Sequence, residues 1–70
     1  MRIELTDRGR HRANVPGHST LAGAILDRLA EVQGPMDTRD LATDLRASEA
    51  SINSAAQVLG NHSYVTKVGE

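Results

Sequence analysis

The 70-residue sequence contains no cysteine, tryptophan or phenylalanine, and Tyr64 is its only aromatic residue. Without cysteine there is neither a disulfide framework nor a thiolate metal site. The core must therefore be aliphatic, and many of the candidate core positions are alanine. A chain this short buries only about 60% of the surface that its unfolded form exposes. We therefore expect marginal stability. Two possibilities stay equally open: a plain monomer, or a form that is stabilised by a partner or as a homodimer.

The sequence also lacks a long apolar run and a large net charge. No run approaches the roughly 20 apolar residues that span a bilayer, and the first twelve residues lack the apolar core of a signal peptide. A cytoplasmic protein without membrane association is therefore expected. The net charge is −1, whereas many nucleic-acid-binding domains are strongly basic because phosphate neutralisation supplies much of their affinity.

Catalytic patterns are missing as well. The three histidines, His11, His18 and His62, are far apart in the sequence, and no serine has a histidine and an acid nearby. The glycines are scattered and form no phosphate-binding loop. Three aspartates between residues 37 and 44 could form a Mg²⁺ patch, but a helix start and a solvated face explain them better. We predict a protein that is not an enzyme and that has no cofactor and no metal.

Residues 36 to 59 predict two short helices joined by a tight turn. Asp37 and Ser48 are N-cap candidates, because their short side chains accept hydrogen bonds from the free N–H groups of a first turn. Apolar residues then recur at helical spacing, at Leu41, Ala42 and Leu45 and again at Ile52, Ala55, Ala56 and Leu59. The second helix is expected to stop at Gly60-Asn61, because both residues tolerate the left-handed conformation of a C-terminal cap.

The flanking segments predict one more helix and two strands. Ile3 and Leu5 alternate with polar residues, which is typical of a short half-buried strand. A basic arm and a linker are expected to follow as far as residue 18. Ser19 or Thr20 then caps a helix that ends by residue 33, because Gly34-Pro35 cannot continue it. The apolar stripe of that helix is Leu21, Ile25, Leu29 and Val32.

A second strand is expected from Tyr64 to Val68, which is rich in residues that favour strands. Pairing with Arg2 to Leu5 would satisfy its backbone. On one face of this strand we expect Tyr64, Thr66 and Val68, and on the other Val65 and Lys67. The order of elements is then strand, helix, helix, helix, strand.

Two stretches resemble one known family. Gly34 to Leu45, GPMDTRDLATDL, resembles the second helix of winged-helix transcription regulators, with a Gly-Pro, a capping residue and a Leu-Ala-x-x-Leu core. Ser48 to Leu59, SEASINSAAQVL, is similar to their recognition helix. The resemblance implies one α+β domain over residues 1 to 70, with three helices (residues 19 to 59), a small two-stranded antiparallel sheet and a curtailed wing.

A shorter stretch, Leu5 to Arg10 (LTDRGR), is similar to the segment where the last strand of the wing leaves such a domain. In that family the segment follows the wing, whereas here it precedes the helices. Three explanations stay open: the first strand has the same role from the other end of the chain, the similarity is chance, or an ancestor carried tandem winged helices.

The resemblance implies sequence-selective binding of double-stranded DNA in transcriptional control, with the helix at 48 to 59 in the major groove. Asparagine and glutamine can pair bidentately with adenine. The predicted base-reading residues are Asn53, Ser54 and Gln57, and the predicted phosphate contacts are Ser51 and Arg46. Arg39 and Lys67 would flank the site, and Arg8, Arg10 and Arg12 would form an electrostatic arm. The alternative for this arm is a solvated, mobile end of the chain.

A second function stays open, because such helices often carry Arg or Lys where this one has Ser54, Gln57 and Val58. The chain would then be a protein-interaction module that kept the fold and lost the basic face. It would engage a partner or a second copy through the small side chains of the helix or through the edge of the last strand.

Overall fold

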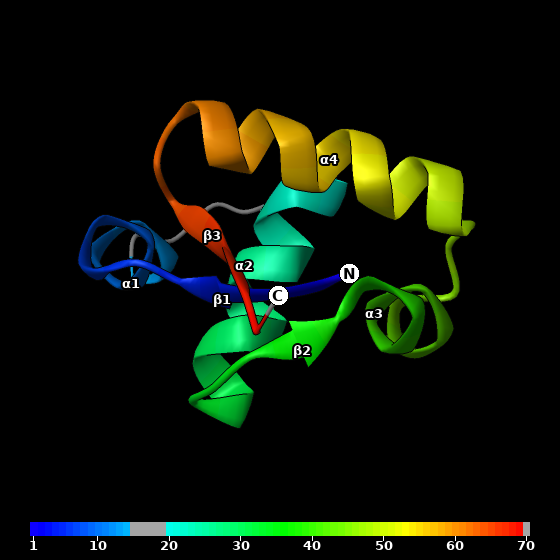
Figure 1. Ribbon diagram of the computed structural model, residues 1–70, viewed down its shortest axis with the longest axis horizontal. Coiled ribbons are helices and arrows are strands. Elements are labelled where there is room, and N and C mark those ends of the chain that lie inside the picture. The colour runs from blue at the N-terminus through cyan, green and yellow to red at the C-terminus, as the bar shows by residue number, and fades with distance from the viewer. Residues whose placement is uncertain (15–19, 70) are drawn as a thin grey trace.

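A computed structural model describes residues 1–14 and 20–69 of the chain. Within them lie four helices and three strands, which make a small α+β fold (Figure 1). In chain order the elements are β1 (Arg2–Leu5), α1 (Asp7–Ala13), α2 (Leu21–Val32), β2 (Met36–Asp37), α3 (Thr38–Leu45), α4 (Glu49–Asn61) and β3 (Val65–Val68).

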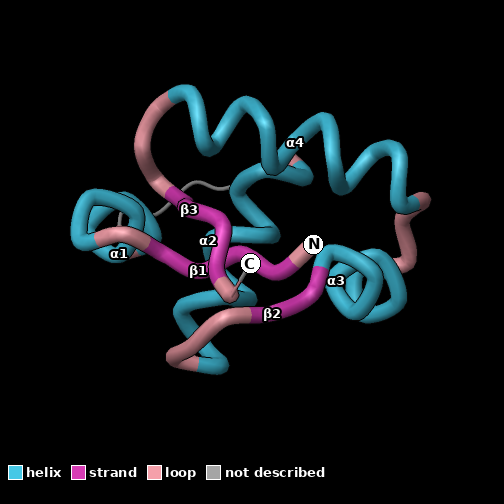
Figure 2. Tube along the Cα trace, viewed as in Figure 1, coloured by secondary structure: helices cyan, strands magenta, loops and turns pink. Residues whose placement is uncertain are grey.

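The sheet is antiparallel with the order β2-β1-β3, so the first strand of the chain is its central strand (Figure 2). The predicted pairing of the two terminal strands is confirmed, with Leu5 opposite Val65. The prediction of two strands is wrong, because Met36 also pairs with Ile3. Pro35 disfavours a helical conformation for the residue before it, so the chain leaves α2 extended and β2 forms along the open edge of β1.

The basic arm predicted for the N-terminal segment is a helix over residues 7 to 13. Thr6 caps α1 by accepting a hydrogen bond from the Gly9 N–H at 3.0 Å. The Thr6 N–H also donates to the Tyr64 carbonyl oxygen at 3.0 Å, which fixes the start of α1 beside the start of β3. Only Gly9 is buried in α1. The helix therefore has almost no apolar stripe, which is why hydrophobic periodicity did not predict it.

Helix α2 forms the centre of the core. Thr20 is its N-cap, as one of the two predictions had it, while Ser19 lies outside the described residues. Ile25 and Leu29 are fully buried, together with residues from β1, α3 and α4: Ile3, Leu41 and Ile52. Val32 was predicted in the same stripe, but it is 41% exposed, because it lies in the last turn, where the chain leaves the helix through a left-handed Gln33.

The predicted pair of helices is confirmed. Asp37 caps α3 by accepting from the Arg39 N–H at 2.8 Å, and Ser48 caps α4 by accepting from the Ser51 N–H at 3.1 Å. The predicted stop at Gly60-Asn61 is wrong, because α4 includes both residues. The left-handed residue is Ser63, with φ of 62°. Glycine and asparagine tolerate that conformation without requiring it, and the helix ends only where the chain must turn into β3.

Candidate nucleic-acid interface

Helix α4 runs along the top of the molecule in Figure 1, and it exposes a row of polar residues. The three predicted base-reading residues, Asn53, Ser54 and Gln57, are all exposed. They share one side because the apolar residues of the helix, such as Ile52 and Ala56, repeat at helical spacing and are buried. Asn53 and Gln57 are neighbours at i and i+4. Asn61 extends this row by one more turn, and sequence reasoning missed it because it ended the helix too early.

A groove of about 430 Å³ lies between α4 and the sheet. Its walls include Asn53 and Gln57 from α4, and Ile3 and Lys67 from the sheet. Lys67 is directly opposite Ile3 in the register, so both side chains lie on the face of the sheet that faces the core. Among the described residues Lys67 is the only charged side chain that lines this groove. The groove therefore combines carboxamides, an apolar floor and one positively charged side chain.

The residues at the start of α4 are partly engaged with one another. The Arg39 Nε lies 3.3 Å from a carboxylate oxygen of Glu49, so a negative charge offsets that of Arg39. The Ser48 hydroxyl donates to the Ser51 Oγ at 2.9 Å, which commits the predicted phosphate contact Ser51 to the helix cap. Arg46 is exposed, and it is the residue in the left-handed conformation that ends α3.

The three arginines of the predicted arm, Arg8, Arg10 and Arg12, are exposed on α1. The Arg8 guanidinium lies 5.9 Å from the ring centroid of Tyr64, just beyond the C-terminal end of α4. Arg39 and Arg46 belong to α3 and its end, on the opposite side of the molecule (Figure 1). The ten predicted site residues therefore form three groups, one near each end of α4 and one along its middle.

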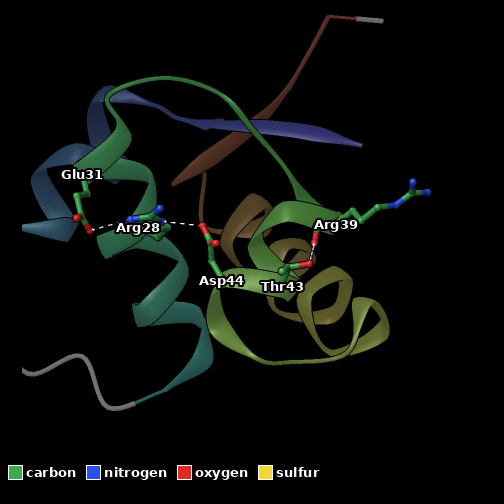
Figure 3. A network of polar contacts seen from close by, with 5 residues as sticks. All are labelled: Arg28, Glu31, Arg39, Thr43 and Asp44. Carbon is green, nitrogen blue, oxygen red and sulfur yellow. Dashed lines mark hydrogen bonds and ion pairs between the residues drawn. The ribbon is translucent and has the colours of Figure 1, made fainter.

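An ion-pair network holds α2 against α3. The Arg28 Nε lies 3.0 Å from Asp44, and an Arg28 terminal nitrogen lies 3.3 Å from Glu31 (Figure 3). The hydrogen bond and charge of Asp44 raise the pKa of Arg28 above its ordinary value. In the same view the side chain of Arg39 extends away from this network. Arg28 is thus a structural cation, while Arg39 lies at the surface in its ion pair with Glu49.

The carboxylate of Asp37 is held ionised by the helix that it caps. The hydrogen bond from the Arg39 backbone N–H lowers the pKa of Asp37, and the N-terminal amine 3.7 Å away acts in the same direction. Among the described residues no three histidine, aspartate or glutamate side chains gather as a metal site. In that same part of the chain no helix is both long and apolar enough to cross a membrane.

Comparisons of the chain with known protein families, with curated proteins and with solved structures gave no match. Function is therefore inferred from the residues and their arrangement.

Proposed function

We propose that this chain is a winged-helix-like DNA-binding domain that places α4 in the major groove of double-stranded DNA. The observation that carries the proposal is the row of Asn53 and Gln57, which is exposed along α4 and adjoins a groove in which Lys67 is the one charged side chain among the described residues. Carboxamides at i and i+4 can reach successive base edges. Lys67 can neutralise a phosphate beside them.

The order of strands supports the winged-helix interpretation. Strand β1 lies between β2 and β3 and is antiparallel to both. The segment that follows it, LTDRGR, is the one that resembles the exit from the last strand of a wing. Of the three explanations for this similarity, the topology favours the first, in which the N-terminal strand has the same role from the other end of the chain.

The proposed mode of binding has few phosphate contacts. Arg46, Lys67 and the arginines of α1 supply them, because Arg28 is engaged with Asp44 and Arg39 with Glu49. Affinity for duplex DNA falls with salt according to the number of neutralised phosphates, with a logarithmic slope of about −0.9 per contact. Three to five contacts therefore predict a loss of about 40- to 500-fold between 50 and 200 mM salt.

Fluorescence anisotropy with a random-sequence duplex tests this proposal. We expect measurable binding at low salt, and a loss of affinity within that roughly 40- to 500-fold range between 50 and 200 mM salt. Lys67→Gln should weaken binding and lower the slope by about one contact. Arg2→Gln is the matched control: it removes the same charge from the neighbouring strand, but Arg2 lies one position from Ile3 and therefore on the other face of the sheet. Absence of binding at low salt would overturn the proposal.

Once a preferred DNA site has been selected, Asn53→Ala and Gln57→Ala test the assignment of base readers. Each should reduce affinity for that site by about 1–3 kcal/mol and leave binding to random duplex nearly unchanged. Equal loss on both kinds of DNA would mean that these residues do not read sequence.

A protein-interaction module is the second candidate, and the exposure of Val58 favours it. This side chain is 50% exposed on α4 beside the small side chain of Ser54, so another helix could approach closely. If the chain self-associates through this face, Val58→Glu should abolish association in analytical ultracentrifugation, and an unchanged sedimentation profile would remove this route.

A further inference from the structure

Three side chains from two separate parts of the sequence meet just beyond the C-terminal end of α4. The rings of His62 and Tyr64 lie 5.5 Å apart with an angle of 22° between their planes. The Arg8 guanidinium approaches the Tyr64 ring at 5.9 Å from the centroid. Tyr64 is half-buried, whereas His62 and Arg8 are exposed. Among the described residues this is the only pair of stacked rings, and solvent and ligands can reach it.

The backbone under this stack is fixed by several hydrogen bonds. The Tyr64 N–H donates to the Leu59 carbonyl oxygen at 2.9 Å, and the Tyr64 carbonyl accepts from the Thr6 N–H at 3.0 Å. The His62 N–H donates to the Val58 carbonyl at 3.2 Å. The rings are thus carried by a turn that is tied to α4, to β1 and to the start of α1. A flat ligand would meet a surface that is already ordered, which reduces the entropy cost of binding.

Helix α1, which supplies Arg8 to the stack, carries mainly positive charges. Helix α1 carries Arg8, Arg10 and Arg12, and its one carboxylate is Asp7, in the first turn. Arg12 follows Arg8 at i+4, so it lies on the same side of the helix, one turn further along. Within the described residues no ion pair engages Arg8 or Arg12. A ligand with a flat aromatic face and a neighbouring negative charge fits this surface.

We propose that His62, Tyr64 and Arg8 form a stacking platform for an unpaired nucleobase of single-stranded nucleic acid. The base extends the stack on the exposed His62 ring, and Arg12 contacts the adjoining phosphate. Stacking of this kind tolerates any base, because every base has a π face. The platform shares Arg8 and Arg12 with the proposed phosphate contacts, but it goes beyond the proposed duplex-binding face because its stacked rings belong neither to the carboxamide row of α4 nor to the groove beside it.

The platform has its own spectroscopic reporter, because Tyr64 is the only tyrosine and there is no tryptophan. The probes are an eight-nucleotide oligothymidylate and an abasic oligonucleotide of the same length, which has the same phosphates and no bases. We expect oligothymidylate to quench Tyr64 emission, after correction for its absorbance, and to bind at least 5-fold more tightly than the abasic strand. Loss of one stacked base changes affinity by about 5- to 150-fold.

His62→Ala should reduce oligothymidylate affinity within that range and leave affinity for the abasic strand unchanged. The ring of His62 is exposed, so this variant should keep the circular dichroism spectrum of the wild type. His11→Ala is the matched control, because His11 is an exposed histidine on α1 that takes no part in the ring stack, and we expect it to behave like the wild type.

Three results would overturn the proposal: no binding of oligothymidylate, equal affinity for the two strands, or equal behaviour of the two histidine variants. None of these depends on duplex binding. Gln57→Ala should leave oligothymidylate binding intact, so failure of the platform and failure of the α4 interface are distinguishable.

Discussion

Gly9 is a residue at which one added methyl group finds no room. A Cβ built at Gly9 would lie 1.9 Å from the Tyr64 carbonyl oxygen and 2.8 Å from its carbonyl carbon. Both are backbone atoms, so no side chain can rotate to make room. Helix α1 would have to retreat by more than an ångström. That movement would pull the Thr6 N–H away from the same carbonyl, to which it now donates at 3.0 Å.

The expected cost of Gly9→Ala follows from three contributions. Overpacking against a rigid neighbour costs about 3 kcal/mol, the upper part of the usual range. Loss of the Thr6 hydrogen bond adds about 1 kcal/mol, and the better helix propensity of alanine returns up to about 1 kcal/mol. The net destabilisation is about 3 kcal/mol. For 70 residues the total free energy of unfolding is about 4–10 kcal/mol, so the variant should lose much of its stability.

Urea denaturation followed by circular dichroism at 222 nm measures this change, and Gly60→Ala supplies the matched control. A Cβ at Gly60 would meet nothing within 4 Å, and Gly60 lies within α4, so this variant should gain about 0.5–1 kcal/mol. The same chemical change is thus expected to have opposite signs in two helices. A Gly9→Ala protein within 0.5 kcal/mol of the wild type, with an unchanged m-value, would refute the close approach of α1 to Tyr64.

Two further predictions concern charged residues. The pKa of Asp37 is lowered below the ordinary value of 3.8. The contribution of its ionised carboxylate to stability is therefore complete above that pH and is lost as the pH falls through the pKa of the folded state. Asp37→Asn, which keeps a capping side chain, should remove this part of the acid-induced fall in melting temperature between about pH 5 and 2.5. Arg28→Gln should lower the melting temperature only slightly, because its ion pairs are partly exposed; a loss of stability that did not shrink at high salt would contradict this.

The parts of the fold predicted correctly from the sequence are those where local signals agree. Asp37 and Ser48 cap α3 and α4 as expected, because each precedes an apolar stripe at helical spacing. The pairing of β1 with β3 followed from two short alternating strands that each needed a partner. The polar row of α4 was predicted for the same reason: its positions are fixed once the buried stripe is known.

The parts that were missed depend on contacts between distant residues. Helix α1 has no apolar stripe, and its position depends on Tyr64, 55 residues after Gly9. Strand β2 is only two residues long and exists because β1 has an open edge beside it. The stack of His62, Tyr64 and Arg8 was equally invisible, since nothing in the sequence places Arg8 near the end of α4. The spacing of Asn53, Gln57 and Asn61 would have predicted a longer polar row, but only if the helix had been extended past Gly60.

The stretch LTDRGR precedes the main helices in this chain, and three of its residues have a physical role in the fold. Thr6 caps α1 and its hydroxyl donates to the Ser63 carbonyl. Gly9 provides the space in which α1 meets Tyr64. The same close approach of α1 to Tyr64 places the Arg8 guanidinium over the tyrosine ring. These contacts require that a helix follows the central strand β1 and begins beside the start of the neighbouring strand β3. They do not depend on which end of the chain supplies the central strand. The motif that completes the sheet therefore also brings positive charge to the end of α4, where the sequence of α4 itself has none.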